Sequence, residues 1–202
     1  MPVLIKKFKF KKLLNEYKSH KYELKLVREV LKDAHLEFEV FYRRYCAEND
    51  IDLDELTRQN QKTVDMIFHS EETGVVPNDP HPKKKESKHK SVYREVARKI
   101  HPDKLDTADP RFWEYTNALK TVNESMNSGQ YGDLFEIADK YEVYLGDYDE
   151  VYEDLINNIE DIKQKIKSES ATYSYALYEC ANDEDCKEKV VKNFLWQIFK
   201  WK

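Results

Sequence analysis

The stretch SVYREVARKIHPDK, residues 91–104, predicts an amphipathic helix that ends in a short polar loop. Its apolar residues recur at helical spacing along one side of the helix. They are Val92, Val96 and Ile100, with Tyr93 and Ala97 beside them. Basic residues follow at steps of four along another side, at Lys90, Arg94 and Arg98. We therefore expect one side of this helix to enter a core and another to present positive charge to a partner.

Pro102 ends the helix, because proline lacks the amide donor and disfavours helical geometry at the residue before it. The polar loop that follows contains Pro110, and beyond it apolar side chains return at helical spacing. They are Phe112, Tyr115, Ala118, Leu119, Val122 and Met126. The pattern predicts two antiparallel helices joined by a rigid loop that exposes His101, Pro102 and Asp103.

Composition predicts that the rest of the chain is helical too. The 202 residues include only 4 glycines and 6 prolines, about half the usual share of these turn-formers. That is too few for a β-sandwich, barrel or propeller, and the glycine-rich phosphate-binding motifs are absent. The charged fraction of 36% favours long solvated helices. We expect an all-α protein without a transmembrane segment, because no apolar run is long enough to span a bilayer.

The helix breakers divide the chain into segments. Every glycine, and every proline except Pro2, lies between residues 74 and 146. Clustered prolines and a run of lysines mark a linker through which no helix can continue. The predicted organisation is a long-helix arm over 1–70, a linker over 71–86, a helical module over 87–145 and a second helical arm over 146–202.

Both arms carry heptad-like apolar stripes. The first runs through Phe10, Leu13, Tyr17, His20, Leu24, Val27, Leu31, Ala34, Phe38, Phe41 and Tyr45, and the second through Tyr148, Tyr152, Leu155, Ile159, Ile162 and Ile166. Alternating steps of three and four predict long helices that need a partner. We favour packing of the stripes on one another as a helical hairpin or bundle. A dimeric coiled coil with a second copy of the chain is the alternative.

Aromatic residues and lysines interleave at both ends of the chain, in FKFKK (8–12) and FLWQIFKWK (194–202). Such segments are typical of helices that lie on a membrane surface or contact nucleic acid. We favour a third interpretation, in which the aromatic side chains pack inward and the lysines point to solvent. No specific nucleic acid is then expected as a partner.

Nothing in the sequence predicts catalysis or metal binding. The six histidines include no pair spaced four residues apart, and no nucleophile is paired with a base. We therefore expect no enzyme, no cofactor and no metal site. The three cysteines, Cys46, Cys180 and Cys186, are expected to be free thiols. A Cys180–Cys186 bridge is the alternative.

Residues 87–145 resemble a J-domain, the DnaJ-type co-chaperone module. The family's second helix and loop read Tyr-Arg/Lys-Lys/Arg-x-Ala followed by His-Pro-Asp-Lys, and its third helix reads Phe-x-x-Ile-Asn-x-Ala-Tyr-x-x-Leu. The matching residues are Tyr93, Arg94, Ala97, His101, Pro102, Asp103 and Lys104, then Phe112, Ala118 and Val122, with Tyr115 and Leu119 at the Ile and Tyr places. The implied core of the module comprises Val92, Val96, Ala97, Ile100, Phe112, Tyr115, Ala118, Leu119 and Val122.

The resemblance implies a co-chaperone. J-domains dock on the seventy-kilodalton, DnaK-type heat-shock chaperone and stimulate its ATP hydrolysis, so that the chaperone closes on a client. The implied docking loop comprises His101, Pro102, Asp103 and Lys104, and the implied docking face comprises Lys88, Lys90, Tyr93, Arg94, Arg98 and Lys99. The helical arms would then bind a client or an assembly partner, and the expected location is the cytoplasm.

The chain departs from the family pattern in several places, one of which is Thr116 where the family commonly has Asn. Glu95 stands where the family usually has a basic residue, and the first-helix signature Asp-Tyr-Tyr-x-x-Leu is missing, with residues 64–68 as the expected substitute. The resemblance is to divergent J-proteins that keep only the J-domain, and phages and large DNA viruses encode some with a tail similar to residues 127–138. The alternative function is a structural or assembly protein, associated with a virion for example, that uses a J-like fold for binding without stimulating a chaperone.

Overall fold

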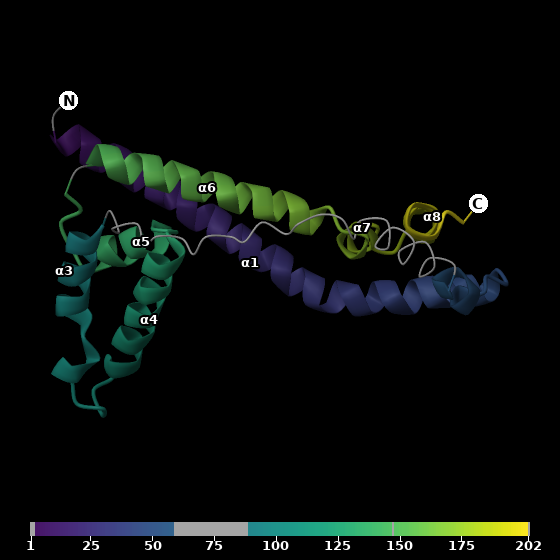
Figure 1. Cartoon of the computed structure of the whole chain (residues 1–202), viewed down its shortest axis with the longest axis horizontal. Coiled ribbons are helices and arrows are strands. Elements are labelled where there is room, and N and C mark those ends of the chain that lie inside the picture. Colours follow the sequence, from purple (N-terminus) through teal and green to yellow (C-terminus); the bar gives the residue numbers. More distant parts are fainter. Residues whose placement is uncertain (1–2, 59–88, 147, 202) are drawn as a thin grey trace, which may run out of the picture. The chain divides into compact units, whose positions relative to one another are not determined.

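The computed structural model describes residues 3–58, 89–146 and 148–201. These ranges are helical and contain no strand, so the all-α prediction is confirmed (Figure 1). The elements are α1 (Val3–Glu48), α3 (Lys90–Ile100), the short 3₁₀ helix η1 (Pro102–Lys104), α4 (Phe112–Ser128), α5 (Gly132–Lys140), α6 (Tyr148–Ser170), α7 (Tyr173–Glu179) and α8 (Glu184–Phe199). The predicted linker and the substitute helix expected at residues 64–68 lie outside the described residues. None of the described helices is long and apolar enough to cross a membrane.

The chain forms two compact units, each assembled from segments that lie far apart in the sequence. Unit 1 comprises Met1–Glu23 and His81–Gln164, and unit 2 comprises Leu24–Pro80 and Lys165–Lys202. Helices α1 and α6 begin in unit 1 and end in unit 2. Two long helices thus supply side chains to both units.

The apolar stripe predicted along α1 is buried inside the chain. All its members are buried except Leu13 and His20, which are half-buried. Leu14 is only 1% exposed, although the stripe predicts Leu13 as the core position. The shift follows from helix geometry, because an α-helix drifts by about 20° per heptad against a 3.5-residue repeat. The stripe is therefore covered by intrachain packing, as the bundle interpretation expects.

In unit 1 the start of α1 lies beside α6, and the two helices run parallel (Figure 1). The Lys6 ammonium donates to Asp149 at 2.6 Å, and the Lys163 ammonium donates to Glu16 at 3.2 Å. The Tyr152 hydroxyl donates to the Lys6 carbonyl at 2.7 Å. Polar contacts at both edges therefore fix the register in which the apolar stripes of the two helices meet.

Helix α5 begins close to both α1 and α6. The Gly132 amide donates to the Oδ1 of buried Asn158 in α6 at 2.6 Å, and a Cβ at Gly132 would lie 2.3 Å from the Tyr17 ring of α1. Glycine permits this close approach because it has no side chain. The Tyr17 hydroxyl donates to Asp133 at 2.9 Å. Burial, together with the Asp133 carboxylate, raises the pKa of Tyr17 far above its usual value, so the phenol stays protonated and remains a donor.

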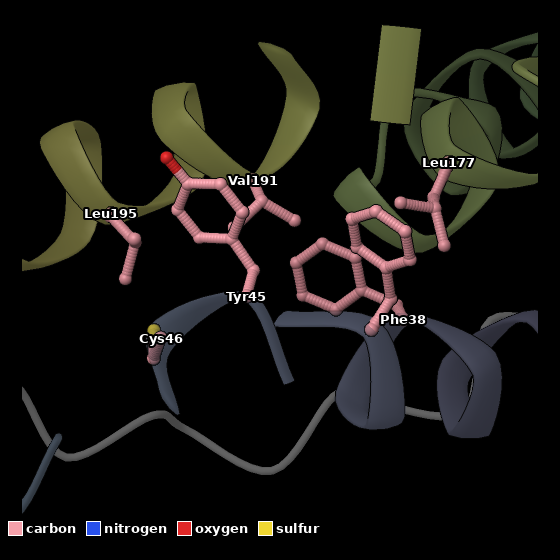
Figure 2. Close-up of a cluster of buried hydrophobic side chains, with 7 residues drawn as sticks. Phe38, Tyr45, Cys46, Leu177, Val191 and Leu195 are labelled. Carbon is pink, nitrogen blue, oxygen red and sulfur yellow. The ribbon is translucent and has the colours of Figure 1, made fainter. Parts of the chain in front are cut away.

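In unit 2 the later part of α1 packs against α7 and α8. Figure 2 shows Phe38 and Tyr45 of α1 in one cluster with Leu177 of α7 and with Val191 and Leu195 of α8. All five side chains are buried. This apolar cluster holds the two short helices against α1.

The cysteine prediction is wrong for two of the three residues. Cys180, directly after α7, and Cys186, in the first turn of α8, form a disulfide instead of staying free. Their Cα atoms are 5.5 Å apart, because a short turn reverses the chain between them. Asp183 caps α8 in that turn by accepting a hydrogen bond from the Cys186 amide at 3.0 Å. Cys46 is free and buried.

The aromatic residues near the chain ends do not all pack inward. Phe10 is buried, but Phe8 is 66% exposed, and Trp196 and Ile198 are 49% and 43% exposed. The inward-packing prediction is therefore wrong for the two aromatic residues among these, Phe8 and Trp196. One helix face cannot bury both Phe8 and Phe10, because residues two positions apart point about 200° apart around the helix axis.

The close approach at Gly132 predicts an unusual response to substitution. Replacing a helical glycine with alanine normally stabilises a protein, but here Gly132→Ala should lower the free energy of unfolding by about 1–3 kcal/mol through overpacking against Tyr17. Chemical denaturation measures the change. In the double variant Gly132→Ala/Tyr17→Leu the added methyl should cost less than it does alone. A stabilised Gly132→Ala variant would contradict the packing described here.

Candidate functional site

Helix α3 is held in unit 1 by the apolar side that its sequence predicts. Val92, Val96 and Ile100 are 3%, 0% and 0% exposed, and α3 packs against both α4 and α5. Val122 of α4 is fully buried. The other predicted core residues are half-buried: Ala97, Phe112, Tyr115, Ala118 and Leu119. The two predicted helices therefore form a packed pair whose connecting loop faces solvent.

The loop after α3 is a short, internally bonded turn. His101 is extended, with φ −65° and ψ 123°, as expected for a residue before proline. Pro102–Lys104 then forms η1, in which the Lys104 amide donates to the His101 carbonyl at 3.2 Å and the Leu105 amide to the Pro102 carbonyl at 2.8 Å. The Lys104 ammonium donates to the Arg98 carbonyl near the end of α3. The loop is therefore folded against its helix before any partner arrives.

His101 and Asp103 interact within this turn. The His101 Nδ1 accepts from the Asp103 amide at 3.4 Å and lies 3.4 Å from the Asp103 Oδ2. The Asp103 side chain is 84% exposed, and that of His101 is 46% exposed. The arrangement presents a carboxylate to solvent at the tip of a defined turn, where it can accept hydrogen bonds from a cationic group of a partner.

The basic residues of the predicted docking face that the structure describes are all exposed. Arg94 is exposed, and the Arg98 side chain is 75% exposed and lies 4.0 Å from Glu95. Lys90 is exposed as well, and Lys88 lies outside the described residues. The outward positive charge that the structure describes thus runs along α3 from Lys90 through Arg94 to Arg98.

Two other predicted docking residues hold α3 to its neighbours. The Lys99 ammonium donates to the carbonyls of Tyr141 and Glu142 at 2.7 and 3.1 Å, directly after α5. A cation is favourable there, because the last carbonyls of a helix lack intrahelical partners and carry partial negative charge. The Tyr93 hydroxyl donates to Asn123 of α4 at 2.8 Å. Both side chains therefore brace α3 against α4 and α5.

His89 anchors the start of α3, and sequence reasoning did not find it. Its side chain is 3% exposed, its Nε2 lies 2.7 Å from the Asp154 Oδ2 of α6, and its ring packs edge-on against Tyr131 and Phe135. A buried imidazole needs such a polar partner, because leaving its nitrogen unpaired would cost free energy. No local signal predicts the pair, since 65 residues separate its members.

Asp109 and Arg111 order the start of α4. The Asp109 carboxylate accepts from the Arg111 amide at 2.8 Å and from its guanidinium at 2.8 and 3.1 Å. These hydrogen bonds with Arg111 lower the pKa of Asp109 to about 2. An aspartate shortly before an apolar helix is a recognisable start signal, so the sequence did carry a hint of this contact.

Other charged groups of unit 1 form ion pairs between its helices. Lys140 pairs with Glu114 at 2.7 Å, and Lys21 pairs with Asp133 at 2.6 Å and with Glu136 at 2.9 Å. These pairs line the shallow groove between α4 and α5. Among the described residues, no three His, Cys, Asp or Glu side chains gather closely enough to hold a metal ion.

The contacts of Lys99 predict that replacing it destabilises the protein more than replacing its neighbour Arg98 does. Lys99→Met should lower the free energy of unfolding by about 1 kcal/mol, because it leaves the carbonyls after α5 without their charged donor. Arg98→Met is the matched control and should leave stability unchanged within error, since that side chain is exposed. Thermal denaturation followed by circular dichroism compares the two variants, and equal stabilities would contradict the bracing role.

The Asp109–Arg111 contact predicts a pH dependence. A native pKa of about 2, below the ordinary 3.8, means that the contact contributes to stability above the ordinary value and loses its contribution as the pH falls through about 2. NMR titration of the Asp109 carboxyl carbon should show this low pKa. Arg111→Ala should raise it toward 3.8, whereas Lys120→Ala, a change on the same helix α4, should not move it.

Comparison with known proteins assigns no family. No family model matches the chain, and neither a curated protein nor a solved structure matches it. The function of the loop at residues 101–104 and of the basic side of α3 therefore has to be argued from their own residues and geometry.

Proposed function

We propose that this chain is a J-domain co-chaperone that docks on a DnaK-type chaperone and stimulates its ATP hydrolysis. One observation carries the proposal: the His-Pro-Asp turn of residues 101–103, with Asp103 exposed, lies between a basic amphipathic helix and a second apolar helix. A tripeptide alone is a weak signal, but here it occupies the turn between two packed helices. No hydrolytic group has to come from this chain, because the chaperone supplies the chemistry.

Docking begins with charge. Arg94 and Arg98 point outward from α3, beside the loop, and a positive face steers the encounter with an acidic surface more than it strengthens the final complex. Glu95 lies 4.0 Å from Arg98 and reduces this field. The departure from the family pattern at Glu95 therefore predicts slower association rather than loss of the docking mode.

The loop then supplies the specific contact. The exposed Asp103 carboxylate accepts charge-assisted hydrogen bonds from an arginine of the chaperone. Pro102 and the hydrogen bonds of η1 hold the turn in place before docking, so little conformational entropy is lost when the partner binds. His101 orients the turn through its contact with the Asp103 amide.

The helical arms would select what the chaperone acts on. They add long helices to the hairpin of α3 and α4, and a client or assembly partner bound by them would be brought to the recruited chaperone. The second candidate function is a structural or assembly protein that keeps the J-like hairpin for binding only. Glu95 and the missing first-helix signature favour that alternative.

A single-turnover ATPase assay with a DnaK-type chaperone tests the proposal. The full chain should accelerate hydrolysis, and Asp103→Asn should reduce the stimulation by about tenfold or more, because a hydrogen bond to a charged group contributes about 1.5–3 kcal/mol. The substitution removes charge while keeping shape. Arg94→Glu/Arg98→Glu should also reduce stimulation, and should weaken its dependence on salt.

Glu150→Gln is the matched control, because it removes one exposed carboxylate of unit 1 from α6, away from the loop. It should stimulate as the unaltered chain does. The proposal fails if the unaltered chain gives no stimulation, or if Asp103→Asn and Glu150→Gln stimulate equally well.

A further inference from the structure

The start of α1 exposes three large apolar side chains. Leu4, Ile5 and Phe8 are 64%, 45% and 66% exposed. Leu4 and Phe8 are four residues apart, so they lie one turn apart on the same face of the helix. This face is not an unfilled part of the core, because the opposite side of α1 is already packed, with Phe10 and Leu14 2% and 1% exposed.

Lysines surround this apolar face. The segment VLIKKFKFKK, residues 3–12, contains five lysines and no acidic residue. Lys6 and Lys11 contact Asp149 at 2.6 Å and Asp139 at 3.6 Å. The other three lysines are exposed, and no described carboxylate lies within ion-pair distance of them: Lys7, Lys9 and Lys12.

Helix geometry places these lysines on both sides of the apolar pair. Successive residues advance by about 100° around the axis, so Lys7 and Lys11 flank the line from Leu4 to Phe8 on one side, and Lys12 flanks it on the other. An outward apolar line between two rows of lysines is the pattern of a helix that lies in a membrane interface, with apolar groups at the acyl boundary and ammonium groups among the phosphates.

We infer that residues 3–12 form a binding patch for an anionic lipid bilayer. Leu4, Ile5 and Phe8 enter the headgroup region, and the lysines contact lipid phosphates and carboxylates. A nucleic acid is a poorer match, because Leu4 and Ile5 offer no flat surface on which a base can stack. This inference does not depend on the proposed co-chaperone function.

The patch and the His-Pro-Asp turn belong to the same unit, and they lie at opposite ends of it. Figure 1 shows the beginning of α1 beside the start of α6, whereas the turn between α3 and α4 is at the far end of those helices. A bilayer that contacts residues 3–12 therefore leaves the turn accessible to a partner.

The same helix offers a matched control. Leu36 and Val40 are also four residues apart on α1 and are 66% and 61% exposed, which nearly equals the exposure of Leu4 and Phe8. Their neighbours, however, include the acidic Glu37 and Glu39, and the nearby basic residues each pair with a glutamate: Lys32, Arg43 and Arg44. The exposure of the two apolar residues is thus nearly the same at both places, whereas the start of α1 adds lysines that no described carboxylate pairs with.

Vesicle sedimentation of the full chain tests the inference, using phosphatidylcholine vesicles with and without phosphatidylserine. Binding should require phosphatidylserine and should weaken as salt is added. Leu4→Ser/Phe8→Ser should weaken binding by about tenfold or more. Lys7→Glu/Lys9→Glu/Lys12→Glu should also weaken vesicle binding by about tenfold or more. Leu36→Ser/Val40→Ser should leave vesicle binding unchanged.

Three outcomes would overturn the inference. The first is no binding to the phosphatidylserine vesicles, and the second is an equal loss of binding in the Leu36→Ser/Val40→Ser control. The third is binding to a single-stranded oligonucleotide that depends on the lysines, together with vesicle binding that Leu4→Ser/Phe8→Ser leaves unchanged. Circular dichroism of each variant verifies that the exposed substitutions leave the helices intact.

Discussion

The Gly132 amide, the Asn158 side chain and the Tyr17 ring meet at the first residue of α5, and the arrangement of unit 1 depends on this contact. The amide has no helical partner at the start of its helix, and buried Asn158 supplies the acceptor at 2.6 Å. The Tyr17 ring occupies the space that any side chain at position 132 would need. One backbone position therefore joins three helices, α1, α5 and α6. The hairpin of α3 and α4 packs against α5.

The hairpin is fastened at both ends of α3. At its start, His89 pairs with Asp154 of α6, and at its end Lys99 reaches the carbonyls that follow α5. With the two ends held, the loop that begins at His101 projects from a rigid base. A docking contact benefits from such preorganisation, because the entropy cost of ordering the loop is met during folding and not during binding.

Charge serves two purposes in unit 1. The carboxylates Asp133 and Glu136 of α5 pair with Lys21 of α1, so these charges hold two helices of the unit together. The arginines of α3 and the lysines at the start of α1 include several that no acidic group of the described residues neutralises. Positive charge is thus what the two proposed binding surfaces of this unit offer to partners: the chaperone-docking face of α3 and the lipid-binding patch at the start of α1.

The sequence by itself determined the helices and the turn. The steps of three and four in α1, the apolar side of α3 and the break at Pro102 appear in the structure where the pattern predicts them, apart from the shift from Leu13 to Leu14, because helical periodicity and the missing proline amide act locally. Only the tertiary structure decided which side chains became contacts. His89 meets Asp154 across 65 residues, Lys99 donates to the carbonyls after α5, Phe8 stays exposed while Phe10 is buried, and Cys180 joins Cys186. Such choices depend on which groups the packed helices bring within a few ångströms of one another, and a one-dimensional pattern does not contain those distances.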